Sequence, residues 1–148
     1  MNNNKQELLL LATQARTLGL MPLKDQSEGA CLYIAFFLKF MLSSFQGKYE
    51  AHIRGGGNGD SGTIDVDGTM QGHYWVEVKD MATGESFIVD PTADQFGYDK
   101  VVIIPLREND RYFPGSQTEI DNHVDDIRQD LTKTAQGLFL DEARNRLY

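Results

Sequence analysis

The segment 30–45 constrains the fold most, because it is apolar on nearly every side. It reads ACLYIAFFLKFMLSSF, and Lys39 is its only charged residue. A helix of this composition has almost no polar face to turn to solvent, so most of its surface has to be covered. The sequence therefore predicts a buried helix over 30–45, capped by Ser27 or Gly29, with Cys31 in its first turn.

The remaining apolar patterns predict an α+β fold. Helical spacing of leucine and alanine indicates a helix over 4–18, and similar spacing returns over 118–147. Between the helices the pattern changes to short alternating runs, which are typical of strands. Strands are expected over 48–54, 70–79, 85–90 and 100–106, the last one ended by Pro105. Because these strands follow one another directly, we expect an antiparallel sheet packed on helices.

Two stretches between these elements are interpreted as irregular. GGGNGDSG, at 55–62, is too rich in glycine for regular structure. It is either a surface loop or a loop that borders a substrate cleft. RENDRYFPGS, at 107–116, is interpreted as a linker.

Length and charge limit the classes of function. A chain of 148 residues suits one domain over 1–148, and 41% hydrophobic residues suffice for a core. The net charge of −8 argues against a nucleic-acid partner, which needs clustered Lys and Arg. The leucine run at 8–11 is too short to span a membrane, and no signal-peptide cleavage site follows it. We expect a cytoplasmic protein, or one exported without a cleavable signal peptide.

Cys31 is the only cysteine, so it cannot form an internal disulfide. It is either a small apolar residue of a buried helix or a nucleophile at a helix N-terminus, where the helix dipole favours a thiolate. A nucleophilic thiol also needs an imidazole partner. His123 lies in the polar segment EIDNHVDD and is expected at the surface, which leaves His52 and His73.

The strands over 70–79 and 85–90 predict a hairpin that brings His73 close to Asp90. If Met81 pairs with Gly84, paired residue numbers sum to 165 and His73 is diagonal to Asp90. A sum of 163 places the two directly opposite each other. Both registers put them on one face, with about 5 to 8 Å between Cβ atoms, whereas a loop with an odd number of residues would separate them. The hairpin can therefore present an imidazole that a carboxylate orients.

Three segments resemble the papain-like and transglutaminase-like superfamily of cysteine enzymes. They are EGACLYIAFFL, GHYWVEV and FIVDPTADQFG, in this order, and the last two are similar to the transglutaminase-like pattern HAWVEV followed by DPT. The resemblance covers about residues 26–97 and implies a papain-like fold. It also implies that Cys31 is the nucleophile, His73 the general base and acid, and Asp90 the residue that orients His73.

The resemblance leaves some roles open. Gln26, five residues before Cys31, matches the papain-type glutamine that stabilises the oxyanion, but the papain-type surroundings C-G-S-C-W are absent. Trp75 is expected to shield the His–Asp pair or to belong to the core. Glu77 shares the face of His73, and either lines the pocket or pairs with Lys79. Asp94 is a second candidate for the orienting carboxylate.

The implied activity is amide hydrolysis through a thioester, on a protein or peptide substrate. A peptidase, an amidase and a glutamine deamidase all fit. Alternatives are an acyl transferase of the transglutaminase type, and a binding protein that keeps the scaffold without catalysis. No cofactor is expected. A metal site is not expected either, because one cysteine and three dispersed histidines lack the spacing of metal ligands.

Overall fold

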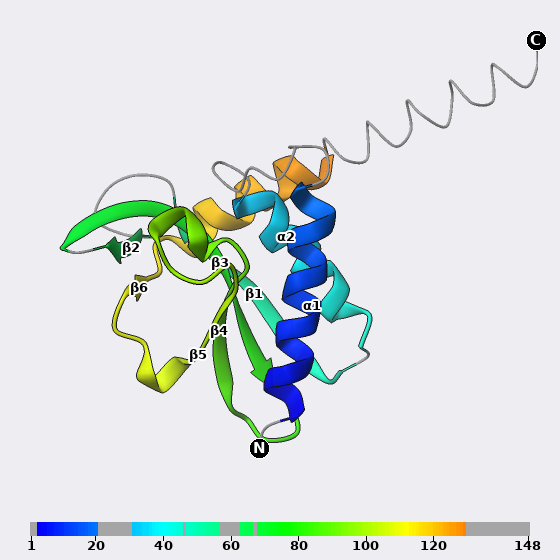
Figure 1. The fold of residues 1–148 in the computed structure, drawn as a ribbon. Helices are drawn as coiled ribbons and strands as arrows, with labels where there is room; N and C mark the ends of the chain where they lie inside the picture. Colours follow the sequence, from blue (N-terminus) through cyan, green and yellow to red (C-terminus); the bar gives the residue numbers. More distant parts are fainter. Residues whose placement is uncertain (1–2, 21–30, 46, 57–62, 67, 130–148) are drawn as a thin grey trace, which may run out of the picture.

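The chain folds into an antiparallel sheet packed on helices, which confirms the α+β expectation (Figure 1). The computed structural model describes residues 3–20, 31–45, 47–56, 63–66 and 68–129. Helix α1 covers Asn3–Leu20 and helix α2 covers Cys31–Ser43. A further helix covers 117–129, and the rest of the expected helix over 118–147 lies outside the described residues, as do the expected caps Ser27 and Gly29.

Six strands in the described residues form the sheet, in the order β5-β4-β3-β2-β6, with β1 also paired to β3. Strand β3 is the longest, and it pairs with β1 over 73–80 and with β2 over 69–72. The strands are β1 (Tyr49–Gly56), β2 (Thr63–Val66), β3 (Thr69–Asp80), β4 (Ser86–Asp90), β5 (Val102–Pro105) and β6 (Tyr112–Phe113). Two short 3-10 helices follow β4 and β5, namely η2 (Ala93–Phe96) and η3 (Leu106–Glu108).

Among the described residues, the larger of two core clusters joins α1, α2 and the 117–129 helix to the sheet. The helices gather on one side of the strands in Figure 1. Their buried side chains meet those of Ile53, Val76, Val78, Phe87 and Val89. The helical members of this cluster are Leu8, Leu11, Ala12, Ala15, Ile34, Ala35, Leu38, Leu42, Ile120 and Val124.

The expectation that α2 is covered on most sides is only partly confirmed. One face of α2 is buried, but Phe40 is 69% exposed and Tyr33 is 41% exposed. Leu18, at the end of the apolar stripe of α1, is also exposed. Composition alone could not show this, because a helix that is apolar all round gives no sign of which face meets the sheet.

The second core cluster contains Ile64, Trp75, Ile88 and Tyr112. Strands β2 and β6 contribute to it, and the sequence patterns missed both. The expected linker over 107–116 contains β6, and the glycine segment begins inside β1, which continues to Gly56. These strands were missed because they have four and two residues, too few to show an alternating pattern. Residues 57–62 of the glycine segment lie outside the described residues.

The β3–β4 hairpin has the register in which paired numbers sum to 165, since Val76 pairs with Val89. Residues 81–84 connect the two strands, so the connection is longer than the two-residue loop that a Met81–Gly84 pair would close. The Gly84 N–H donates to the Asp80 carbonyl at 2.7 Å, and the Asp80 side chain accepts from the Ala82 N–H at 2.9 Å. A loop of four residues has the same parity as one of two, so each side chain keeps its predicted face.

Gly55 lets β1 approach β3 at His73. The φ angle of Gly55 is +130°, and a Cβ atom there would lie 2.1 Å from the carbonyl oxygen of His73. No side chain fits at that distance, so a larger residue must push the two strands apart. The glycine thus fixes the backbone position of His73.

We expect Gly55→Ala to lower the free energy of unfolding by about 3 kcal/mol, because its Cβ meets rigid backbone. Urea unfolding followed by the fluorescence of Trp75, the one tryptophan, measures the loss. The matched control is Gly84→Ala, which also has positive φ but has no atom within 4 Å of the added Cβ. It should cost only about 1 kcal/mol. Equal losses in the two variants would contradict the steric argument.

No helix in these described ranges has the length and apolar character that crossing a membrane requires.

Candidate active site

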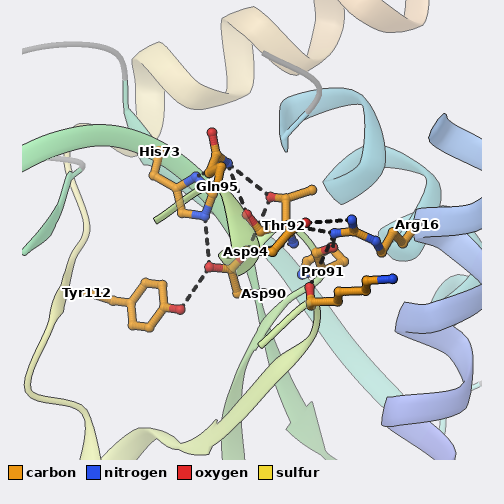
Figure 2. A network of polar contacts seen from close by, with 9 residues as sticks. Arg16, His73, Asp90, Pro91, Thr92, Asp94, Gln95 and Tyr112 are labelled. Atoms are coloured by element: carbon orange, nitrogen blue, oxygen red, sulfur yellow. Dashed lines mark hydrogen bonds and ion pairs between the residues drawn. The ribbon is translucent and has the colours of Figure 1, made fainter. Parts of the chain in front are cut away.

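The hairpin brings His73 and Asp90 into direct contact, as the predicted register requires. The His73 Nε2 atom lies 2.8 Å from Asp90 Oδ2, and both side chains are 0% exposed (Figure 2). Because an ionised carboxylate only accepts hydrogen bonds, Nε2 carries a proton and donates it to Asp90. The carboxylate thereby fixes the orientation of the imidazole ring.

Asp90 accepts hydrogen bonds on both of its oxygens. Oδ2 also accepts from the Tyr112 hydroxyl at 2.8 Å, and Oδ1 accepts from the Thr92 N–H at 3.0 Å and from its hydroxyl at 3.4 Å. A buried carboxylate is costly unless such donors replace water. Tyr112 and Thr92 thus make a charged Asp90 possible beneath His73.

Cys31 approaches the same imidazole from the first residue of the described part of α2. Its thiol lies close enough to His73 to raise the pKa of the imidazole, and the residue is half-buried. Since Nε2 is held by Asp90, Nδ1 is the ring nitrogen left for the thiol. The structure therefore places Cys31, His73 and Asp90, from α2, β3 and β4, close to one another.

The charges around His73 favour its protonated form. Burial by itself lowers the pKa of His73. The charge and hydrogen bond of Asp90, together with those of Cys31, outweigh burial and raise the pKa from 6.5 to about 9. Burial and the charge of Asp90 also raise the pKa of Tyr112, which keeps its hydroxyl a donor. An imidazolium can therefore persist here at neutral pH.

Gln95 contacts His73 as well, which no sequence pattern indicated. Its Nε2 atom lies 3.2 Å from His73 Nδ1 and 3.1 Å from the carbonyl oxygen of Thr92. Residues 90–96 fold tightly because Thr92 bonds back to Asp90 and η2 follows at once. Asp90 followed two residues later by Thr92 is a sequence pattern typical of a turn. The residues around Gln95, however, do not indicate that η2 brings its side chain back to His73.

Aromatic rings surround the imidazole. Phe96 meets it edge-on, with 4.7 Å between ring centroids, and Trp75 lies 6.2 Å away. The rings of Trp75 and Tyr112 are also in contact, with 5.0 Å between their centroids, and Trp75 is 1% exposed. Trp75 thus belongs to the core and helps to keep water from the His–Asp pair, so both predicted roles fit its position. Tyr112 itself lay in the expected linker and was missed as a site residue.

Asp94 is not the orienting carboxylate, because it forms a two-pronged ion pair with Arg16 of α1. Both oxygen–nitrogen distances are 2.7 Å. Arg16 also donates to the carbonyl of Pro91 at 3.1 Å and is only 9% exposed. Figure 2 shows this pair beside the His73–Asp90 contact. It ties α1 to the turn that carries Thr92 and Gln95.

The other candidate residues lie elsewhere. Glu77 pairs with Arg54 at 3.1 Å rather than with Lys79. On β1, the Nε2 atom of His52 lies 3.2 Å from Oε1 of Glu50. His123 is exposed, and its Nδ1 atom lies 2.8 Å from the Tyr74 hydroxyl oxygen. Gln26, the expected oxyanion donor, lies outside the described residues.

Within the ranges that the structure describes, no three His, Cys, Asp or Glu side chains are grouped so that they could hold a metal ion.

Comparison of the chain with protein-family models, with curated proteins and with solved structures finds no match. The assignment of a chemistry therefore depends on the geometry of the site itself.

The raised pKa of His73 predicts that stability falls as the pH rises from 6.5 to 9. A group whose pKa is higher in the folded than in the unfolded protein stabilises the folded state when it is protonated. This stabilisation is complete at a pH below the unfolded-state pKa, and it is lost as the pH rises through the folded-state pKa. The free energy of unfolding should fall by up to about 3 kcal/mol across this range. Urea unfolding of the wild type at a series of pH values measures it.

The His73→Gln variant is the control, because it lacks the titrating ring. It should be less stable than the wild type at pH 6 and should lose most of this pH dependence. A wild-type stability that stays level or rises between pH 6.5 and 9 would show that His73 is not held as described.

Proposed function

We propose that this protein is a cysteine-dependent amide hydrolase that acts through a thioester. The observation that carries the proposal is the contact chain from Cys31 through His73 to the buried Asp90. A thiol, an imidazole and an orienting carboxylate in this order are the parts that nucleophilic acyl transfer needs. The motif order along the chain supports membership of the papain-like and transglutaminase-like superfamily.

In the first half of the proposed reaction, the Cys31 proton moves to Nδ1 of His73 and the sulfur attacks the amide carbon of the substrate. The carbonyl electron pair moves to oxygen, forming a tetrahedral oxyanion. When this intermediate collapses, the carbon–nitrogen bond breaks and His73 returns the proton to the leaving amine. A thioester on Cys31 remains. Asp90 stabilises the imidazolium throughout.

In the second half, water replaces the amine. His73 takes a proton from the water as it attacks the thioester carbon, and the sulfur leaves with the electron pair of the broken bond. Returning the proton to Cys31 regenerates the thiol and releases a carboxylic acid. The raised pKa of His73 supports this role, because a leaving amine requires a protonated imidazole.

The proposed oxyanion site lies at the start of α2. Within the described residues α2 begins at Cys31, and the N–H groups of the first turn of a helix have no partner within the helix, so the Cys31 N–H is the proposed first donor to an oxyanion beside its own sulfur. Gln26 remains the proposed second donor. The proposed substrate is a protein or peptide, cleaved at a backbone amide or at a glutamine side chain.

One observation favours a second candidate function, a binding protein that has kept the scaffold without turnover. The His73 side chain is 0% exposed, so its imidazole meets no substrate in this arrangement. The net charge of −8 suits a basic protein partner. Turnover separates the two candidates.

We expect Cys31→Ala to abolish turnover of a mixed peptide substrate while the far-ultraviolet circular dichroism spectrum stays unchanged. Mass spectrometry of the products identifies the reaction, since peptide cleavage, glutamine deamidation and amine transfer change the substrate mass differently. If the wild type and Cys31→Ala convert the peptides equally, the cysteine mechanism is wrong.

Asp90→Asn tests the role of the carboxylate. It should lower kcat by about two to four orders of magnitude, because the neutral amide no longer stabilises the imidazolium. The matched control is Asp125→Asn, whose exposed carboxylate pairs with Arg128 on the surface of the 117–129 helix. It should retain wild-type kcat. A kcat within twofold of wild type in Asp90→Asn would remove Asp90 from the mechanism.

A further inference from the structure

The amide of Gln95 has only one favourable orientation. Its Nε2 atom donates to the Thr92 carbonyl oxygen at 3.1 Å, with the Thr92 hydroxyl oxygen at 3.4 Å. Exchanging the amide nitrogen and oxygen would set two acceptors against each other. The same Nε2 lies 3.2 Å from His73 Nδ1, so Gln95 faces the imidazole as a donor (Figure 2).

This donor matches only the neutral form of His73. In the neutral ring, Nε2 carries the proton and donates to Asp90, while Nδ1 accepts from Gln95. In the imidazolium, Nδ1 also carries a proton, which would point at the N–H of Gln95. Asp90 and the Cys31 thiolate therefore favour the imidazolium, whereas Gln95 opposes it.

Cys31 and Gln95 compete for one lone pair. Nδ1 has a single acceptor site, and it is the ring nitrogen that Asp90 leaves open. The thiol can pass its proton to Nδ1 only when the Gln95 N–H gives up that site. The carbonyl oxygen of an amide substrate is an acceptor that can take the Gln95 N–H instead.

We propose that Gln95 is a positioning residue that disfavours the thiolate–imidazolium form of the Cys31–His73 pair until another acceptor binds the Gln95 amide. In the proposed hydrolase, on which this role rests, Gln95 would restrain the nucleophile Cys31 while no substrate is bound. Gln95 is uncharged, so replacing it with an uncharged residue leaves the surrounding charges as they are. The titratable groups around the imidazole are Asp90 of β4, Cys31 of α2, Tyr112 of β6 and, beyond Gln95 in η2, Asp94 in its ion pair with Arg16.

The test is a titration of the His73 ring nitrogens by nitrogen-15 NMR in the full-length chain without substrate. The spectra of His52→Gln and His123→Gln assign the three histidines. Gln95→Leu removes the donor at nearly the same volume. We expect its His73 titration to move upward by up to about one pH unit, which corresponds to one hydrogen bond.

Two further variants make the result specific. Gln95→Asn keeps an amide that is too short to reach Nδ1, so it should shift the titration in the same direction, and it serves if Gln95→Leu does not fold. Gln117→Leu is the matched control, because Gln117 bonds Arg54 and the Ile53 carbonyl rather than His73. It should leave the His73 titration at its wild-type value.

A second readout follows the thiol. Once the restraint is removed, the thiolate becomes more populated, and iodoacetamide should alkylate Cys31 at pH 6 up to about tenfold faster in Gln95→Leu than in the wild type. The proposal is overturned if His73 in a folded Gln95 variant titrates at the wild-type pH or below it. Neither measurement involves turnover, so a failure of the hydrolase proposal would be seen separately, in the peptide assay.

Discussion

The candidate site depends on one buried carboxylate. Asp90 is 0% exposed, and it accepts from His73, Tyr112 and Thr92. These residues belong to β3, to β6 and to the turn after β4, so a single side chain connects three separate parts of the structure. The donors stabilise its charge where water is absent, and the charge in turn holds His73 as a donor and favours the imidazolium.

The fold supplies the geometry that this carboxylate needs. Strand β3 is long enough to pair with β1 and β2 in succession, and Gly55 lets β1 meet the backbone of His73 without a clash. The helices on one side of the sheet place Cys31 at the imidazole, while Arg16 ties α1 to the turn after β4. Opposing influences then act on one ring, since Asp90 and Cys31 favour its charge and Gln95 disfavours it.

The β-hairpin could be predicted because side-chain direction in a strand depends only on parity. Any loop with an even number of residues between β3 and β4 places His73 and Asp90 on one face, so the four-residue connection keeps both side chains on the face that parity predicts. The partners of this pair could not be found in the same way. Tyr112 reaches Asp90 through β6, a two-residue strand, and Gln95 reaches His73 through one turn of 3-10 helix.

By itself, the sequence determined the α+β class, an apolar helix that begins near Cys31, and the shared face of His73 and Asp90. These follow from local periodicity, which a chain carries in its own residue order. Only the tertiary structure decided that Asp94 pairs with Arg16, that Glu77 pairs with Arg54, and that Gln95 and Tyr112 complete the site. Each of these contacts depends on how separate elements pack or on how a turn closes, and periodicity carries no information about either.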